Sequence, residues 1–259
     1  MYSAIAANKR NTVIIITLFV ALIGGLAYAW GYYSGQGSSA WFIIGFVALY
    51  ALFQYYVSSS LAVAMSGAVP ISKTDNPRLW RTVENIAIRE GMPMPKVYII
   101  PDDAPNAFAT GRDPEHALIA FTTRILEVMD REELQGVIAH EMSHVANRDT
   151  LVSAVAATTA GAIAILSDFL MRLMWFGGGR DRDRNSNPFA LVLSLVVLVM
   201  APLAAMLLKS AISRKRESLA DATAVSFTRN PAGLRKALEV LAADTTVVRQ
   251  KSNAVAHIW

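Results

Sequence analysis

The chain has no cysteine among its 259 residues. This absence excludes a disulfide framework and any metal site that is built from thiolates. It also fits a catalytic part that faces the reducing cytosol. Histidine is scarce as well, with four residues, so a metal site made of imidazoles has few candidates.

Charged residues make up only 17% of the chain and are largely missing from four apolar runs, each long enough to span a bilayer. The runs comprise residues 13–30, 40–65, 150–176 and 189–212. Asp168 and Arg172 interrupt the third run, but their spacing of four lets them pair on one helix face. The runs predict four transmembrane helices.

The sequence leaves other interpretations of these runs open. Ala27-Tyr28-Ala29 resembles a cleavage site, so the first run could be a signal peptide. A second uncharged run begins at Ala40, however, and a hairpin of two spans is the simpler interpretation. The later pair could be a buried hairpin in a soluble core, although the length of the Phe189 to Leu208 run favours membrane spans.

From Ser66 the composition becomes that of a soluble domain. The expected elements are a helix at 76–90, strands at 96–100, 106–111 and 117–121, and an amphipathic helix at 231–243. A Gly-Arg-Asp-Pro turn follows the strand at 106–111, so this strand is short and is expected at a sheet edge.

The most specific motif is His140-Glu141-Met142-Ser143-His144. Asp130 and Glu133 precede it with the spacing of a helix capping box. On a helix, positions i and i+4 lie one turn apart on one face, so both imidazoles can chelate one Zn²⁺. Glu141 then points at the open coordination position, where it can serve as general base. This is the ligand geometry of a zinc peptidase.

A catalytic zinc site usually has a third protein ligand. Downstream of His144 the chain has one histidine, His257, and two glutamates, Glu217 and Glu239. Glu217 is favoured, because Asp221 follows one helical turn later and can accept a hydrogen bond from a ligand imidazole. Glu239 has no such partner and lies in an ordinary amphipathic pattern.

Lysine and arginine near the span ends place the amino terminus and the domain from Lys73 to Arg148 on the cytoplasmic side. If both later runs cross the membrane, the segment from Arg214 returns to that side, as one metal site demands. Three arginines between the later runs oppose this orientation. The net charge is +4, and the basic residues lie beside the apolar runs, so no nucleic-acid partner is expected.

The predicted fold is a mostly α membrane protein of the α+β type. Four transmembrane helices accompany a small sheet and an HExxH helix, which form a zincin-like catalytic domain on the cytoplasmic side. The predicted parts are a transmembrane hairpin at 1–65, the sheet and HExxH helix at 66–149, a second hairpin at 150–212, and a carboxy-terminal catalytic part with the third ligand at 213–259.

Three motifs stand around the later hairpin: Asn106-Ala-Phe-Ala-Thr-Gly, HEMSHVANRD and SRKRESLAD. With them the chain resembles the HtpX-type membrane-integral zinc metalloproteases, gluzincins related to the CAAX prenyl endopeptidases. The resemblance covers nearly the whole chain. It implies a multi-pass endopeptidase of the plasma (inner) membrane, with one Zn²⁺ per chain, that faces the cytoplasm and degrades misfolded or damaged membrane proteins under stress.

The same resemblance implies a role for each motif residue. His140, His144 and Glu217 become zinc ligands, Glu141 the catalytic base, and Asp221 the partner of a ligand. Substrate-binding groups along the cleft are then Asn106, Ala107, Phe108 and Ala109. Members commonly continue into a longer tail beyond a stretch like Ala256-His257-Ile258-Trp259, so this chain is expected to be shortened or divergent, with His257 as a candidate oxyanion donor.

Two functional alternatives follow from the sequence. The first is a dedicated processing protease that acts on one membrane-associated substrate. The second is a non-enzymatic four-span module, whose HExxH would be incidental or only structural.

Overall fold

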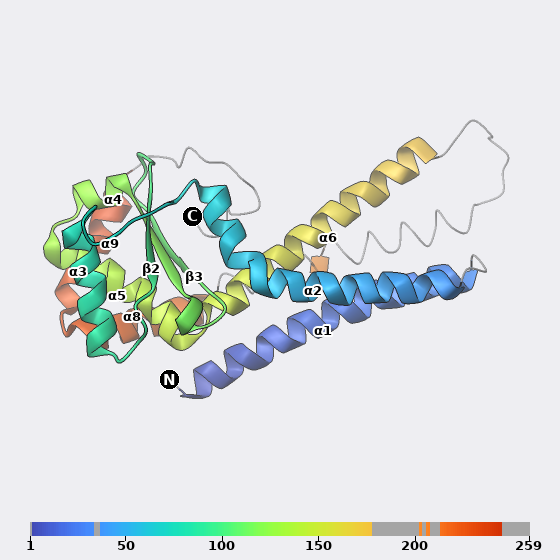
Figure 1. The fold of residues 1–259 in the computed structure, drawn as a ribbon, viewed down its shortest axis with the longest axis horizontal. Coiled ribbons are helices and arrows are strands. Elements are labelled where there is room, and N and C mark those ends of the chain that lie inside the picture. The colour runs from blue at the N-terminus through green and yellow to red at the C-terminus, as the bar shows by residue number, and fades with distance from the viewer. Residues whose placement is uncertain (1, 34–36, 178–201, 204–205, 208–212, 245–259) are drawn as a thin grey trace.

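The computed structural model describes residues 2–33, 37–177, 202–203, 206–207 and 213–244. A globular domain lies at one end, and three long helices extend away from it (Figure 1). These helices are α1 (Tyr2–Tyr33), α2 (Gly37–Ser66) and α6 (Thr150–Gly177). The domain contains β1 (Val69–Pro70), α3 (Pro77–Arg89), β2 (Lys96–Ile100), β3 (Ala107–Thr110), a 3₁₀ turn (Pro114–His116), β4 (Leu118–Thr122), α4 (Thr123–Val128), α5 (Arg131–Asn147), α8 (Arg214–Thr228) and α9 (Pro231–Ala243).

Within the described residues, one helix is long and apolar enough to cross a membrane, the stretch Ile5–Gly25 of α1. A second helix, α2, is bent by 62° and passes the same test only if its two halves count as one span. The described apolar part of α6, Thr150–Ala164, is shorter. The structure therefore does not confirm four spans, and most of the fourth run, at 189–212, lies outside the described residues.

The long helices pack on one another and leave other apolar side chains uncovered. Ile15 and Phe19 of α1 belong to one buried cluster with Val155 and Ile163 of α6. Large exposed side chains on the outer surfaces include Val13, Leu18, Trp41, Phe42 and Phe46. Apolar surface of this extent marks a membrane or an interaction site. The expected pair of Asp168 and Arg172 forms, at 2.7 Å.

The four-stranded sheet has the order β1-β2-β4-β3. The central strands β2 and β4 are parallel, and each edge strand pairs antiparallel with its neighbour. All three predicted strands are present, and β3 lies at an edge as expected. Every residue of β4 is buried, because helices α3 and α5 cover one face of the sheet and the end of α2 covers the other.

Helix α5 begins with the predicted capping box. The Asp130 carboxylate accepts hydrogen bonds from the main-chain N–H groups of Glu132 and Glu133, and the Glu133 carboxylate accepts one from Asp130. These bonds satisfy main-chain donors that have no partner inside the helix. The start of α5 is therefore fixed by its own local sequence.

Helix α9 crosses α5 at a pair of glycines. A Cβ atom added at Gly136 would lie 2.8 Å from Cα of Leu234, and one at Gly233 would lie 2.8 Å from the carbonyl oxygen of Glu132. Atoms cannot approach this closely without a shift of the main chain. Glycine is therefore required on both sides of this crossing.

The other end of α5 is held by a buried polar contact with α1. Nδ2 of Asn8 donates to the carbonyl oxygen of Asn147 at 3.0 Å, and both residues are buried. Nδ2 of Asn147 in turn donates to Oγ1 of Thr223 on α8 at 3.4 Å. The first long helix is thus joined directly to the domain.

We expect Gly136→Ala to lower the free energy of unfolding. Overpacking costs about 1–3 kcal/mol, which exceeds the gain of up to about 1 kcal/mol that alanine gives in a helix. Denaturant titration of the purified protein in detergent measures the change. Gly161→Ala in α6 is the control, because nothing lies within 4 Å of its Cβ position. If Gly136→Ala unfolds at the same denaturant concentration as the wild type or at a higher one, the close contact of α5 and α9 at this glycine would be contradicted.

Candidate metal centre

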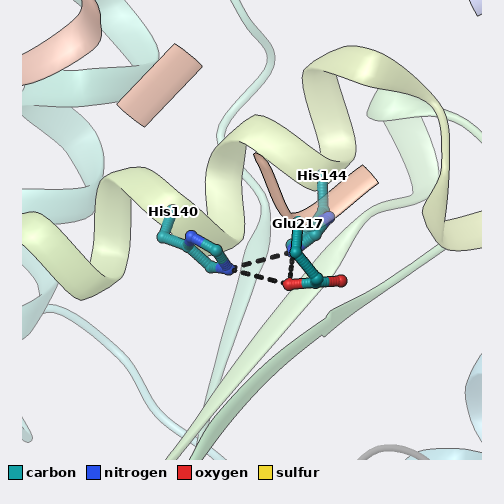
Figure 2. A group of neighbouring side chains, drawn as sticks. All are labelled: His140, His144 and Glu217. Atoms are coloured by element: carbon teal, nitrogen blue, oxygen red, sulfur yellow. Dashed lines mark hydrogen bonds and ion pairs between the residues drawn. The ribbon is translucent and has the colours of Figure 1, made fainter. Parts of the chain in front are cut away.

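Two helices bring three potential metal ligands together (Figure 2). Nε2 of His140 lies 3.2 Å from Nε2 of His144 and 3.5 Å from Oε2 of Glu217. The third separation, from Nε2 of His144 to Oε2 of Glu217, is 3.8 Å. The imidazoles come from successive turns of α5, and the carboxylate comes from α8. The residues predicted from sequence therefore meet in space.

The packing of α8 on α5 explains how Glu217 reaches the histidines. Glu217, Ala220 and Ala224 have the spacing of one helix face, and both alanines are completely buried. Such small side chains let the two helix axes approach closely. The carboxylate at the start of this face is thereby carried to the imidazoles of α5.

The geometry fits a zinc ion. Bonds of about 2.0–2.2 Å in a tetrahedral site place neighbouring ligand atoms about 3.4 Å apart. The three separations, 3.2, 3.5 and 3.8 Å, are close to this value. Two imidazoles and one carboxylate form a donor set that zinc peptidases use, and they leave one coordination position for water.

Asp149 contacts the candidate ligand His144, and sequence reasoning missed it. Its two carboxylate oxygens lie 3.1 and 3.2 Å from Nδ1 of His144, and its side chain is almost completely buried. A carboxylate on the far nitrogen fixes the ring orientation and the tautomer, so that Nε2 faces the metal. Asp149 can therefore orient one ligand.

A left-handed residue makes this contact possible. Arg148 ends α5 with φ 54° and ψ 35°, and the N–H of Asp149 donates to the carbonyl of His144. The chain thereby folds back, and Asp149 lies beside a residue one turn earlier in the helix. Glycine and asparagine are the usual residues at such a position, and arginine gives no signal of it. The sequence HVANRD therefore gives no indication of the contact between Asp149 and His144.

Asp221, the predicted partner, lies on the other imidazole. Its Oδ1 is 2.9 Å from Nδ1 of His140. This is an ion-pair distance, but Nδ1 of His140 makes no hydrogen bond in the described part of the chain.

The charges around the site shift the pKa values of the candidate ligands. Burial lowers the pKa of His144, but the hydrogen bond and charge of Asp149, with the other carboxylates, outweigh it and raise the pKa to about 9. Burial also lowers the pKa of His140, whereas contact with Glu217 and the charge of Glu141 give a net upward shift. The hydrogen bond with His140 lowers the pKa of Glu217.

Glu141 is half-buried and lines a pocket of about 260 Å³ together with His140. Asn106 and Ala107, at the start of β3, form another part of the wall. The candidate base, a candidate ligand and the sheet edge therefore border one space.

The hydrogen-bond pattern shows which groups of β3 are open. The N–H of Thr122 on β4 donates to the carbonyl of Asn106 at 2.9 Å. Paired and unpaired positions alternate in an antiparallel ladder, so the main-chain groups of Ala107 and Ala109 point away from β4. Oδ1 of Asn106 accepts from the N–H of Ala107 at 2.8 Å, so this N–H is already bonded, and the group of Ala107 that a further strand could use is the carbonyl.

The structure limits what two predicted substrate-binding residues can offer a peptide. The Phe108 side chain is buried on the opposite face of the sheet, so this residue can offer a substrate main-chain groups only. Nδ2 of Asn106 is buried and has no hydrogen-bond partner in the described part of the chain. His257, the candidate oxyanion donor, lies outside the described residues.

Comparison with known proteins identifies relatives along the whole chain. The model of the family described as Peptidase family M48 matches residues 73–255. Proteins named "Protease HtpX homolog" share 48% identity in Tropheryma whipplei (strain Twist) and 41% in Thermoanaerobacter pseudethanolicus. Each match covers 100% of this chain and 88% of the relative.

A solved structure shows a similar fold. The crystal structure of S. mikatae Ste24p matches with a TM-score of 0.52 and 19% identity. The match covers 95% of this chain but 63% of that one, so this chain corresponds to less than two thirds of that protein. The mostly helical architecture with a small mixed sheet is therefore shared.

We expect Asp149→Ala to weaken zinc binding by roughly ten- to a hundredfold, because His144 loses the group that orients its ring. Competition with a chromophoric chelator measures the affinity. Asp149→Asn, which keeps an acceptor oxygen, should lose less. Asp168→Ala removes a carboxylate that is exposed on α6 and should bind zinc like the wild type. An unchanged affinity in Asp149→Ala would remove the orienting role.

We also expect zinc affinity to rise with pH until about pH 9. The raised pKa keeps His144 protonated at neutral pH in the metal-free protein, and only the neutral ring binds a metal. Zinc must therefore displace a proton below that pH. Titration calorimetry in two buffers of different ionisation enthalpy counts the protons released. Affinity that is flat between pH 7 and 9, with no proton release, would contradict this.

Proposed function

Because the chain belongs to peptidase family M48, we propose that it is a zinc-dependent endopeptidase for misfolded or damaged membrane proteins, with its catalytic part on the cytoplasmic side. Membership makes the chain a membrane-associated metalloprotease that acts on proteins or peptides. A non-enzymatic four-span module is therefore excluded. We further propose that the chain binds one zinc ion, that the residues of the candidate centre hold it, and that membrane proteins are the substrates.

One observation carries the proposal. His140, His144 and Glu217 converge at zinc-ligand separations, and Glu141 lines the adjoining pocket with the start of β3. A metal-binding group, a base and a strand edge at one place are what hydrolysis of an extended peptide requires.

The chain's own groups account for the proton transfers. Zn²⁺, when bound, supplies Lewis-acid chemistry that lowers the pKa of a water molecule and polarises a carbonyl group. The Glu141 carboxylate accepts a proton from the attacking water and delivers it to the leaving amine. Asp149 holds the imidazole of His144 through Nδ1, and Asp221 lies 2.9 Å from Nδ1 of His140, within ion-pair distance.

The open edge of β3 supports a substrate in extended form. A peptide strand beside Ala107 and Ala109 can add to the sheet through main-chain hydrogen bonds. Such bonds read little sequence, but they require a segment that is free of other structure. An edge of this kind suits misfolded chains better than the single substrate of a dedicated processing protease.

The membrane setting supports the choice of membrane proteins as substrates. The apolar stretch Ile5–Gly25 of α1 can cross a bilayer, and Asn8 within it is bonded to the end of α5. A multi-pass arrangement in the plasma (inner) membrane, with the domain in the cytoplasm, agrees with the charge distribution of the sequence. The relatives named "Protease HtpX homolog" fit a stress-linked quality-control role.

We expect Glu141→Gln to keep zinc and fold while hydrolysis of an unfolded protein falls by about a hundredfold or more. The amide is nearly isosteric with the carboxylate but cannot accept the proton. Activity is followed by gel and mass spectrometry at matched zinc content. Cleavage near the wild-type rate would overturn the assigned base.

Two glutamates test the third ligand in the same assay. Glu217→Ala should lose both zinc and activity, because two imidazoles alone bind the metal weakly. Glu239→Ala is the matched control, since this residue lies on α9 in an exposed pair with Arg235. Loss of zinc from Glu239→Ala but not from Glu217→Ala would overturn the assignment.

A further inference from the structure

A side chain of α1 caps the helix that carries both histidines of the candidate centre. The last carbonyl groups of an α-helix have no partner inside the helix. At the end of α5, the carbonyl of His144 accepts from the N–H of Asp149 at 3.2 Å. The carbonyl of Asn147 instead accepts from Nδ2 of Asn8 at 3.0 Å, and this donor lies 139 residues earlier in the chain. A distant helix therefore supplies one of the terminal hydrogen bonds of α5.

The capped residue lies on the face of α5 that carries the histidines. His140, His144 and Asn147 follow the spacing i, i+4, i+7, so they stand one above another on the helix. The chain then reverses at Arg148, and Asp149 reaches the His144 ring. A shift of the main chain at Asn147 would therefore also move Asp149 relative to that imidazole.

The side chain of Asn147 extends the link to α8. Its Nδ2 donates to Oγ1 of Thr223 at 3.4 Å, and the Thr223 hydroxyl donates to the carbonyl of Leu219 at 2.7 Å. Leu219 stands two residues after Glu217 in the same helix. Asn147 thus joins α1, through its carbonyl, to the helix that carries the third candidate ligand.

The burial of Asn147 calls for more than a packing role. The residue is completely buried, yet its Oδ1 has no hydrogen-bond partner within the described residues. Burying an unpaired polar atom costs free energy, and leucine has a similar size without this cost. The stability of the core therefore does not explain an asparagine at this position. A donor that faces α8 does explain it.

From these observations we propose that Asn147 is a positioning residue of the metal centre, and that Asn8 makes zinc affinity depend on the docking of α1. The inference rests on the zinc site of the proposed function and adds this dependence to it. With α1 docked, Asp149 and Glu217 are held at the histidines. Without that contact both carboxylates can shift, and the ion binds more weakly.

Two substitutions remote from the candidate ligands test the link. Substitutions of this kind change the affinity of a distant site by about 2- to 30-fold. We expect Asn8→Ala and Thr223→Val each to weaken zinc binding within that range, as measured by competition with a chromophoric chelator. Thr223→Ser keeps the hydroxyl and should bind zinc like the wild type. If neither Asn8→Ala nor Thr223→Val changes the affinity, the proposal is overturned.

Two threonines provide matched controls. The hydroxyl of Thr12 donates within α1, and that of Thr82 donates within α3. Thr12→Val and Thr82→Val remove these hydroxyls without touching a bond between α1, α5 and α8. Both variants should therefore keep the wild-type zinc affinity. A loss in either control as large as that of Thr223→Val would overturn the assignment to this link.

A double-mutant cycle shows whether Asn8 and Thr223 act through one network. Substitutions in one network are not additive, whereas those at independent sites are. The double variant Asn8→Ala, Thr223→Val should therefore lose less zinc affinity than the product of the two single losses. Losses that multiply in full would show that α1 and α8 act independently and would overturn the link.

Asn147→Leu separates positioning from stability. Leucine fills the same volume but donates no hydrogen bond to Thr223. We expect it to unfold at the wild-type denaturant concentration or above it, and to bind zinc more weakly by about 2- to 30-fold. An unchanged zinc affinity would overturn the positioning role. Should this variant fail to fold, Asn8→Ala and Thr223→Val still decide the proposal.

Hydrogen exchange of the metal-free protein separates this proposal from the proposed function. Exchange reports local opening, so the amide hydrogens of α8 should exchange faster in Asn8→Ala than in the wild type, and Thr12→Val should match the wild type. If the wild type binds no zinc, the proposed metal centre fails, and the exchange rates still decide the link. Unaltered exchange and zinc affinity in Asn8→Ala would overturn the link and leave the peptidase function standing.

Discussion

The close packing of α8 on α5 is the contact on which the candidate centre depends. Two histidines on one helix give two candidate ligands, but the third candidate, Glu217, stands more than seventy residues further along the chain, beyond α6. Buried alanines at positions 220 and 224 let the helices meet, and their spacing carries Glu217 to the imidazoles. The same face carries Asp221 to Nδ1 of His140. A larger side chain at either alanine would push the carboxylates away.

Much of the domain could be predicted from local patterns. The capping box at Asp130 and Glu133, the three strands and the edge position of β3 depend on residues close in sequence, and all are present. The spacing of His140 and His144 fixed their common face because helix geometry is regular. Choosing Glu217 over Glu239 needed only its relation to Asp221, and the structure places Glu217 beside the histidines.

What sequence could not supply depends on unusual backbone geometry or on distant contacts. Asp149 reaches His144 only because Arg148 adopts a left-handed conformation, which arginine rarely does. Phe108 looked available in an edge strand, yet the end of α2 buries the opposite face of the sheet. The close crossing of α5 and α9 depends on two glycines nearly one hundred residues apart. The apolar runs predicted the lengths of the long helices but not their bends, and α2 is bent by 62°.

The hydrogen bond between Asn8 and Asn147 also determines how far the candidate metal centre lies from the apolar stretch of α1. Asn147 follows His144 by three residues, a rise of about 4.5 Å along the helix. Asn8 lies near the beginning of the apolar stretch Ile5–Gly25. If that stretch crosses the bilayer, the candidate metal ligands stand at the level of the lipid headgroups rather than far from the membrane. A peptide bond in a substrate must then come down to the membrane surface, so the distance of a bond from the bilayer becomes a criterion for cleavage.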